Sequence, residues 1–157
     1  MPLPGRTVAG RTGRPVNVAL PTRLSRPALE LVAQARRSLQ EAWEHTCPAD
    51  RYAAAHLAAL RGAAAVLAAR ARPATSSTRR RPTSAWVMLT SIAPELGEWA
   101  TFFAAGSAKR AAAEAGSTAA VTRRDADDLV RDVDAFLAVV EATLRICLAS
   151  GRVARAG

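Results

Sequence analysis

The sequence has little of several features that mark particular protein classes. Aromatic residues make up only 4% of its 157 residues, and no stretch alternates apolar and polar side chains as a surface strand would. No apolar segment reaches the roughly 18–20 uncharged residues that a membrane span needs, and the N-terminus lacks the compact apolar region of a signal peptide. We therefore expect an all-α cytoplasmic protein without a membrane partner.

Cysteine is also scarce, since Cys47 and Cys147 are the only two in the chain. In a bundle of antiparallel helices Cys47 would open the second helix at one end, and Cys147 would close the last helix at the other. A disulfide between them is not expected, because their Cα atoms would lie too far apart. Two isolated thiols are typical of a reducing cytoplasm.

Lysine is almost absent, with Lys109 standing against 21 arginines and a net charge of +9. Residues 1–26, 72–84 and 151–157 together hold eleven arginines and no acid, so the remaining helical part carries a net charge of −2. Two interpretations stay open. The arginines reflect the codon usage of a GC-rich genome, or these segments bind nucleic acid, with Arg79, Arg80 and Arg81 as the contacts.

The rest of the chain is rich in alanine and leucine at helical spacing, which predicts a bundle. We expect four main helices in an antiparallel up-down bundle of four to five helices that spans residues 24–149. A disordered basic arm at 1–22, a mobile loop at 72–84 and a disordered tail at 150–157 complete the predicted domain organisation.

The first predicted helix begins at the N-cap Ser25 and ends near His45-Thr46. The second runs from Pro48 to about residue 71, where Arg72-Pro73 ends it. Gly62 inside this helix is explained either by a close crossing of another helix or by simple tolerance. Its predicted core stripe has steps of three and four residues: Ala53, Leu57, Leu60, Ala64, Leu67 and Ala71.

A third apolar stripe begins after the capping residue Ser84 and continues past Pro94. This pattern predicts either one helix kinked at Pro94 or two nearly coaxial pieces, the second beginning at the proline. The helix is expected to continue to about Ala115, weakened at Gly106, with Gly116 as its stop.

The last predicted helix begins at a capping box formed by Thr122 and Asp125, and Gly151 should end it. Its first two turns carry acids that suit the positive end of a helix dipole. All three tryptophans lie on apolar stripes and are expected to pack in the core: Trp43, Trp86 and Trp99.

Arg51 and His56 form the one pairing that resembles catalytic chemistry, in the pattern R-x4-H. A histidine can act as acid or base on an RNA 2′-hydroxyl, while an arginine holds the phosphate, without any metal. On an uninterrupted helix the two side chains would point about 140° apart. The alternative is a histidine at the core boundary and a solvated arginine.

Metal ligation is a weaker interpretation of the polar residues, and we expect neither a metal nor another cofactor. His45, Cys47 and His56 lack any paired ligand spacing. The acids of the last helix are explained better by the helix dipole and by solvation: Asp125, Asp127, Asp128, Asp132 and Asp134.

With the helices placed, the chain resembles the HEPN superfamily (higher eukaryotes and prokaryotes nucleotide-binding domains), most closely a small stand-alone actinobacterial family. Three stretches carry the resemblance: RYAAAHLAALRGAAAVLAAR, SAWVMLTSIAPELGEWATFFAAGSAKRAAAEAG and TRRDADDLVRDVDAFLAVVEATL. The resemblance implies a bundle of four or five helices that often dimerises. Active members are metal-independent endoribonucleases, and others bind RNA or nucleotides or pair with a nucleotidyltransferase in toxin–antitoxin systems.

Carried over to this chain, the family's R-x4-6-H motif would make Arg51 the phosphate holder and His56 the acid and base. Two departures from the pattern of active members favour a member without catalysis. Tyr52 follows the arginine, where active members usually have a polar residue. Residues 109–124, which correspond to the usual place of the motif near the start of the last helix, contain no histidine. We therefore expect a non-catalytic binding or interaction module, related to RNA or nucleotides and forming a homodimer. The alternatives are a toxin-like ribonuclease using Arg51 and His56, and a nucleic-acid-associated protein that binds through its Arg-rich tails.

Overall fold

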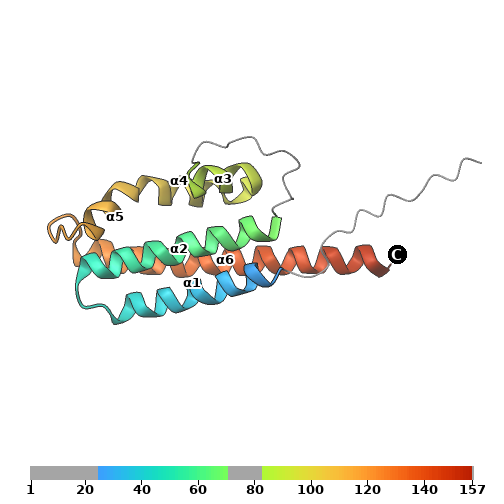
Figure 1. Ribbon diagram of the computed structural model, residues 1–157, viewed down its shortest axis with the longest axis horizontal. Coiled ribbons are helices and arrows are strands. Elements are labelled where there is room, and N and C mark those ends of the chain that lie inside the picture. Colours follow the sequence, from blue (N-terminus) through green and yellow to red (C-terminus); the bar gives the residue numbers. More distant parts are fainter. Residues whose placement is uncertain (1–24, 71–82, 157) are drawn as a thin grey trace, which may run out of the picture.

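The computed structural model describes residues 25–70 and 83–156, of which 146–156 are described by backbone alone. Every regular element in these ranges is a helix, so the predicted all-α bundle is confirmed. Figure 1 shows two long helices, α2 and α6, side by side in the middle of the bundle. The helix α1 covers one side, and a row of short helices covers the other. The helix α1, the helix α2, the row of short helices and the helix α6 run in alternating directions along the bundle.

The element bounds follow the predicted segments closely. They are α1 (Arg26–Glu44), α2 (Pro48–Arg70), α3 (Ala85–Ile92), the 3₁₀ turn η1 (Pro94–Leu96), α4 (Gly97–Ala105), α5 (Ser107–Glu114) and α6 (Arg123–Ala156). The side chain of Ser25 accepts a hydrogen bond from the N–H of Ala28, and that of Ser84 from the N–H of Trp86, so both predicted N-caps are confirmed.

The third predicted segment is broken rather than kinked at Pro94. Ala93 has φ −133° and ψ 71°, outside the helical region, as the clash with a following proline ring requires. A second break at Gly106 separates α4 from α5. Gly116 then ends α5 with φ +83°, and Ser117 donates its N–H to the carbonyl of Ala112 in a Schellman motif.

The capping box at the start of α6 is confirmed. The N–H of Asp125 donates to the hydroxyl of Thr122 at 3.1 Å, and the N–H of Thr122 donates to the carboxylate of Asp125 at 2.9 Å. These hydrogen bonds from Thr122, together with one from Lys109, lower the pKa of Asp125 to about 2. The corner between α5 and α6 is therefore fixed by charged as well as backbone contacts.

The predicted core stripe of α2 is wrong. Leu57 is 42% exposed, and the other stripe residues that the structure describes are only half-buried: Ala53, Leu60, Ala64 and Leu67. The helix instead buries mostly small side chains: Ala49, Tyr52, Ala55, His56, Ala58, Ala59, Gly62, Ala63, Ala65 and Val66. The helix α2 contacts α1, α3, α5 and α6. Its buried face is therefore the one whose small side chains let these neighbouring helices approach closely.

The glycine of α2 marks the close crossing of α2 and α6. A Cβ at Gly62 would lie 2.6 Å from Cδ2 of Leu137 and 3.3 Å from Cε1 of Phe136. Both α6 side chains are fully buried, so neither has free space to move into. Of the two explanations that the sequence left open for Gly62, the close crossing is the one observed.

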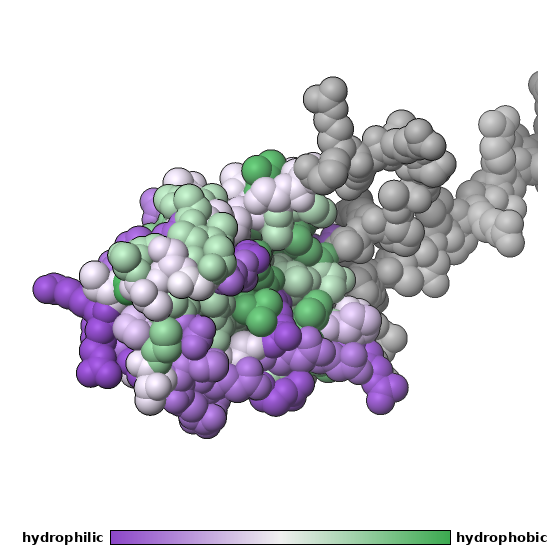
Figure 2. Space-filling model, turned by 60° about the vertical axis from the view of Figure 1, so that its left-hand side comes forward, coloured by the Kyte–Doolittle hydropathy of each residue, from purple (hydrophilic) through white to green (hydrophobic). Residues whose placement is uncertain are grey.

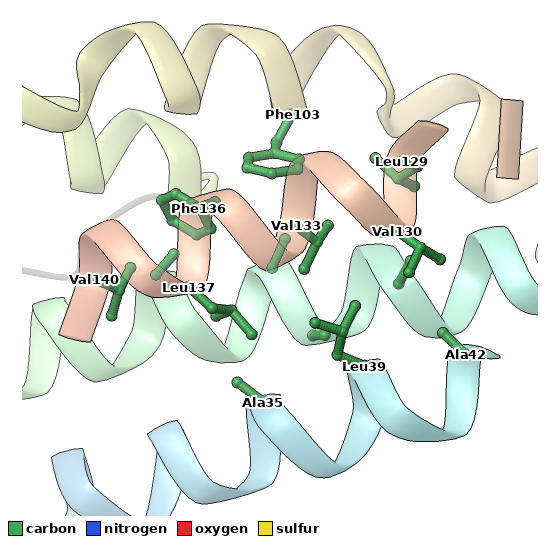
Figure 3. Close-up of a cluster of buried hydrophobic side chains, with 14 of the residues drawn as sticks. Ala35, Leu39, Ala42, Phe103, Leu129, Val130, Val133, Phe136, Leu137 and Val140 are labelled. Atoms are coloured by element: carbon green, nitrogen blue, oxygen red, sulfur yellow. The ribbon is translucent and has the colours of Figure 1, made fainter. Parts of the chain in front are cut away.

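A cluster of aromatic rings joins the short helices to this central pair. Phe103 of α4 lies over Phe136 of α6 (Figure 3), and their ring centroids are 5.0 Å apart. Trp86 of α3 stacks on Phe103 at 5.0 Å, and Trp99 of α4 lies 6.0 Å from the same ring. Phe103 is thus the centre of the contact between the two halves of the bundle.

Two further predictions need correction. Trp43 is not in the core, because it lies in the last turn of α1 and is 47% exposed, while Ala42 takes the buried position. Trp86 is buried as predicted, and Trp99 is half-buried. The last helix does not end at Gly151 but continues to Ala156, since Gly116 is the one glycine with positive φ in the described ranges.

Helix α2 is long and apolar enough to cross a membrane, with a mean hydropathy of 1.3 over an 18-residue window. Half of that window is buried inside the bundle, and a core helix has the same length and composition. Its half-exposed leucines add to the apolar surface of the molecule. Figure 2 shows hydrophobic side chains gathered in the middle of one face, above a band of hydrophilic ones.

We predict that Gly62→Val lowers the free energy of unfolding by about 2 kcal/mol, because the added side chain overpacks the crossing with α6. Gly97→Val is the matched control, since the nearest atom to a Cβ there is Cγ2 of Thr90 at 3.7 Å, an ordinary contact. The control should stay within about 0.5–1 kcal/mol of the wild type. Urea unfolding followed by circular dichroism measures both, and equal stability of the two variants would contradict the crossing.

Candidate functional site

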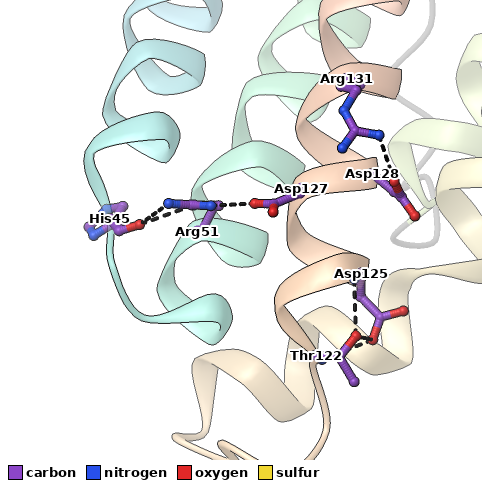
Figure 4. A network of polar contacts seen from close by, with 7 residues as sticks. All are labelled: His45, Arg51, Thr122, Asp125, Asp127, Asp128 and Arg131. Carbon is purple, nitrogen blue, oxygen red and sulfur yellow. Dashed lines mark hydrogen bonds and ion pairs between the residues drawn. The ribbon is translucent and has the colours of Figure 1, made fainter.

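Arg51 lies in the first turn of α2 and joins three parts of the fold. Its Nε and Nη2 atoms donate to the backbone carbonyl of His45 at 3.0 and 2.7 Å. Its Nη1 atom donates to the carboxylate of Asp127 in α6, as Figure 4 shows. The guanidinium therefore ties the turn between α1 and α2 to the first turns of α6. With a side chain only 15% exposed, its hydrogen-bonding capacity is directed into the protein.

His56 lies one turn further along α2, among the aromatic rings of the core. It is fully buried, with edge-to-face contacts to Trp86 and Phe103 at 5.9 and 6.1 Å between ring centroids. Its Nε2 atom is 3.2 Å from the backbone carbonyl of Phe103. Because a carbonyl can only accept, Nε2 carries the proton, and Nδ1 is left as a buried acceptor with no partner among the described residues.

Burial lowers the pKa of His56 below its ordinary value of 6.5, and the hydrogen bond to Phe103 offsets only part of that effect. The ring is therefore neutral at physiological pH. A neutral histidine can accept a proton as a base, but it cannot act as the acid of a cleavage reaction.

The structure does not bring Arg51 and His56 together. Arg51 is directed to the α1–α2 turn and to Asp127, whereas His56 faces α4, and no hydrogen bond joins the two side chains in the described part of the chain. Arg79, Arg80 and Arg81 lie outside the described residues.

Four of the five aspartates between residues 125 and 134 are paired with cations, and among these Asp125 has the contact with Lys109 described above. Asp127 binds Arg51, Asp134 binds Arg36, and Asp128 binds both Arg124 and Arg131. Within residues 25–70 and 83–156, no three histidine, cysteine or acidic side chains gather as metal ligands would. The pairs of Asp127 and Asp134 tie α6 to α2 and α1, whereas those of Asp128 lie within α6.

Next to His56 the structure contains a hollow that the sequence analysis did not identify. Its volume is about 280 Å³, and it lies between α2, the corner between α4 and α5, and α6. Its polar residues are Tyr52, His56 and Lys109. The spacing of four between Tyr52 and His56, which places both on one face of α2, was the available signal. Burial raises the pKa of Tyr52, so its hydroxyl stays protonated and can donate.

Residues 42–141 of the chain match the profile of the SAV_6107-like HEPN family. The matched range covers more than half of the chain, from the last turn of α1 into α6, and includes Arg51, His56 and the hollow. Comparisons with curated proteins and with solved structures gave no significant match.

We predict that His56 makes the stability of the protein depend on pH below neutrality. Its folded pKa is lower than the ordinary 6.5, so the unfolded chain takes up the proton first as the pH falls. The neutral His56 contributes fully to the free energy of unfolding above about pH 6.5. This contribution is lost as the pH falls towards the folded pKa, and the free energy of unfolding then changes by up to about 1.4 kcal/mol per pH unit.

Urea unfolding at a series of pH values from neutral to mildly acidic measures this slope. His56→Leu should remove most of it, because leucine fills a similar volume without titrating. His45→Gln is the matched control and should retain it, since His45 is exposed and uses only its backbone carbonyl in the contact with Arg51. A slope that disappears with His45→Gln and survives His56→Leu would contradict the assignment.

Proposed function

The chain belongs to the SAV_6107-like HEPN family, and from this premise we propose that it is a non-catalytic HEPN domain, a binding or interaction module related to RNA or nucleotides. One observation supports this proposal above the others. The two residues of the R-x4-H pattern have separate structural roles, Arg51 as a tie between the α1–α2 turn and α6, and His56 as a neutral core residue.

Cleavage of RNA by the R-x4-H pair would need the arginine at the phosphate and the histidine within hydrogen-bond reach of the 2′-hydroxyl or the leaving oxygen. Arg51 would have to leave Asp127, a partly buried contact, and the exposed carbonyl of His45. His56 would have to be uncovered from beneath Phe103 and Trp86. Both rearrangements cost free energy. The first breaks the ion pair of Arg51 with Asp127, and the second exposes the aromatic rings of Trp86 and Phe103, which the core now buries.

The interaction part of the proposal is supported by exposed apolar side chains. Isolated ones are normal on a protein surface, but large ones on several helices provide area for a partner. Among the residues whose side chains the structure describes, six large apolar ones are at least 37% exposed: Leu29, Trp43, Leu57, Val87, Phe102 and Val139. We propose a second copy of the chain as the partner, forming a homodimer, with a nucleotidyltransferase as the alternative outcome.

For the absence of catalysis, we predict that the full chain does not cleave single-stranded RNA in buffer with a chelator. A metal-independent ribonuclease serves as the positive control, and denaturing gels of an end-labelled RNA measure the products. Arg51→Met and His56→Leu should give the same background as the wild type. Cleavage by the wild type that is lost in His56→Leu and kept in His45→Gln would overturn the proposal in favour of a ribonuclease.

For the homodimer, we predict a species of twice the 16.5 kDa chain mass in sedimentation equilibrium at micromolar concentrations. Leu57→Asp and Phe102→Asp each place a charge on exposed apolar surface, and at least one of them should weaken the association. Arg145→Asp is an exposed control that should preserve the dimer. A monomer at all concentrations would overturn self-association. A complex that forms only between this chain and a co-expressed nucleotidyltransferase would favour the alternative partner.

A further inference from the structure

The hollow beside His56 is kept open by the absence of a side chain at the corner between α4 and α5. A Cβ at Gly106 would lie 3.0 Å from the hydroxyl of Tyr52 and 3.9 Å from Cδ2 of His56. Any larger residue would therefore fill the space in front of the tyrosine. Gly106 has φ −79°, which other residues adopt without strain. The absence of a side chain at this position therefore matters for the open space in front of Tyr52 and not for the backbone conformation.

Two hydrogen-bond donors meet at the hollow without being fully used. Tyr52 is only 6% exposed, and its hydroxyl has no hydrogen-bond partner in the described part of the chain. The ammonium of Lys109 contacts Asp125 at 3.1 Å, and an ammonium has three donors, so this pair leaves donors for a ligand. Asp125 has the Thr122 hydrogen bonds besides, so it stays satisfied when Lys109 turns towards the hollow.

The remaining walls are apolar and largely aromatic. Phe102 is 47% exposed, while Phe103 and Leu129 are buried beside it. A volume of about 280 Å³ gives room for an occupant the size of a single ring with one substituent, on the order of ten non-hydrogen atoms. The walls therefore suit one flat ring, with the polar groups at one end of it.

We propose that this hollow is a binding site for a small aromatic carboxylate. The ring would lie against the exposed Phe102, above the buried Leu129, and the carboxylate would accept hydrogen bonds from the Tyr52 hydroxyl and the Lys109 ammonium. This goes beyond the proposed function, and it holds equally for a domain that binds RNA, that binds a protein or that cleaves RNA. A failure here would therefore leave the non-catalytic assignment unchanged.

Benzoate is the probe, and benzamide is its neutral match in shape. Two-dimensional ¹⁵N–¹H NMR of the full chain should show shifts at the amides of Gly106, Lys109 and Leu129, with a dissociation constant of about 1 mM. Lys109 is the one lysine in the chain, so selective ¹⁵N-lysine labelling gives a single signal at the hollow. Benzamide should bind about tenfold more weakly, because it loses the charge-assisted hydrogen bond.

Three variants test the polar groups, with the unchanged spectrum outside the hollow as the check on folding. Lys109→Met keeps the alkyl stem and should weaken benzoate about tenfold, and Tyr52→Phe should weaken it severalfold. Arg110→Met removes the neighbouring cation, which pairs with Glu114, and should leave benzoate binding within about twofold.

The proposal is overturned by any of four results. These are no shifts up to about ten times the expected constant, shifts that map away from the hollow, equal binding of benzamide and benzoate, or unchanged binding in both Lys109→Met and Tyr52→Phe.

Discussion

The close approach of α2 and α6 is the contact on which the rest of the bundle depends. At Gly62 the backbone of α2 lies so close to Leu137 and Phe136 that a single carbon atom would collide with the leucine. This spacing brings the alanine face of α2 against α6 and allows Phe136 to reach Phe103 on the other side. The position of the short helices, and with it the environment of His56, follows from that crossing.

Much of the fold could be predicted because local signals decide it. The N-caps at Ser25 and Ser84, the break at Pro94 and the capping box at Thr122 each depend on a few neighbouring residues, and all are present. These signals act through the hydrogen-bonding needs of helix ends, which are the same in any bundle.

The buried face of α2 could not be predicted, because it is decided by how closely the neighbouring helices pack against α2 and not by the hydrophobicity of its side chains. A stripe of leucines at heptad spacing is the stronger signal in one dimension, but leucines hold neighbouring helices apart. With helices packed on several sides of α2, the alanines and Gly62 allow the tighter packing, and the leucines remain at the boundary. The exposure of Trp43 could not be predicted for a similar reason. The spacing of apolar residues along α1 does not reveal where the helix that packs against it ends.

The candidate site was only partly accessible from the sequence. Arg51 and His56 were identifiable as a pattern, and helical geometry alone indicated that they point in different directions. Their partners come from distant segments, 76 residues away for Asp127 and 47 residues away for Phe103. The hollow depends on Gly106, which in the sequence is only a residue that weakens a helix.

The carbonyl of Phe103 accepts hydrogen bonds from other groups besides His56. The backbone N–H of Gly106 donates to it at 3.1 Å and the hydroxyl of Ser107 at 3.5 Å, so three donors from two segments converge on one oxygen. An imidazolium still donates from Nε2, so uptake of a proton would leave this junction intact. Acid would therefore loosen the helices as one cooperative unit rather than swing α5 outward as an isolated flap.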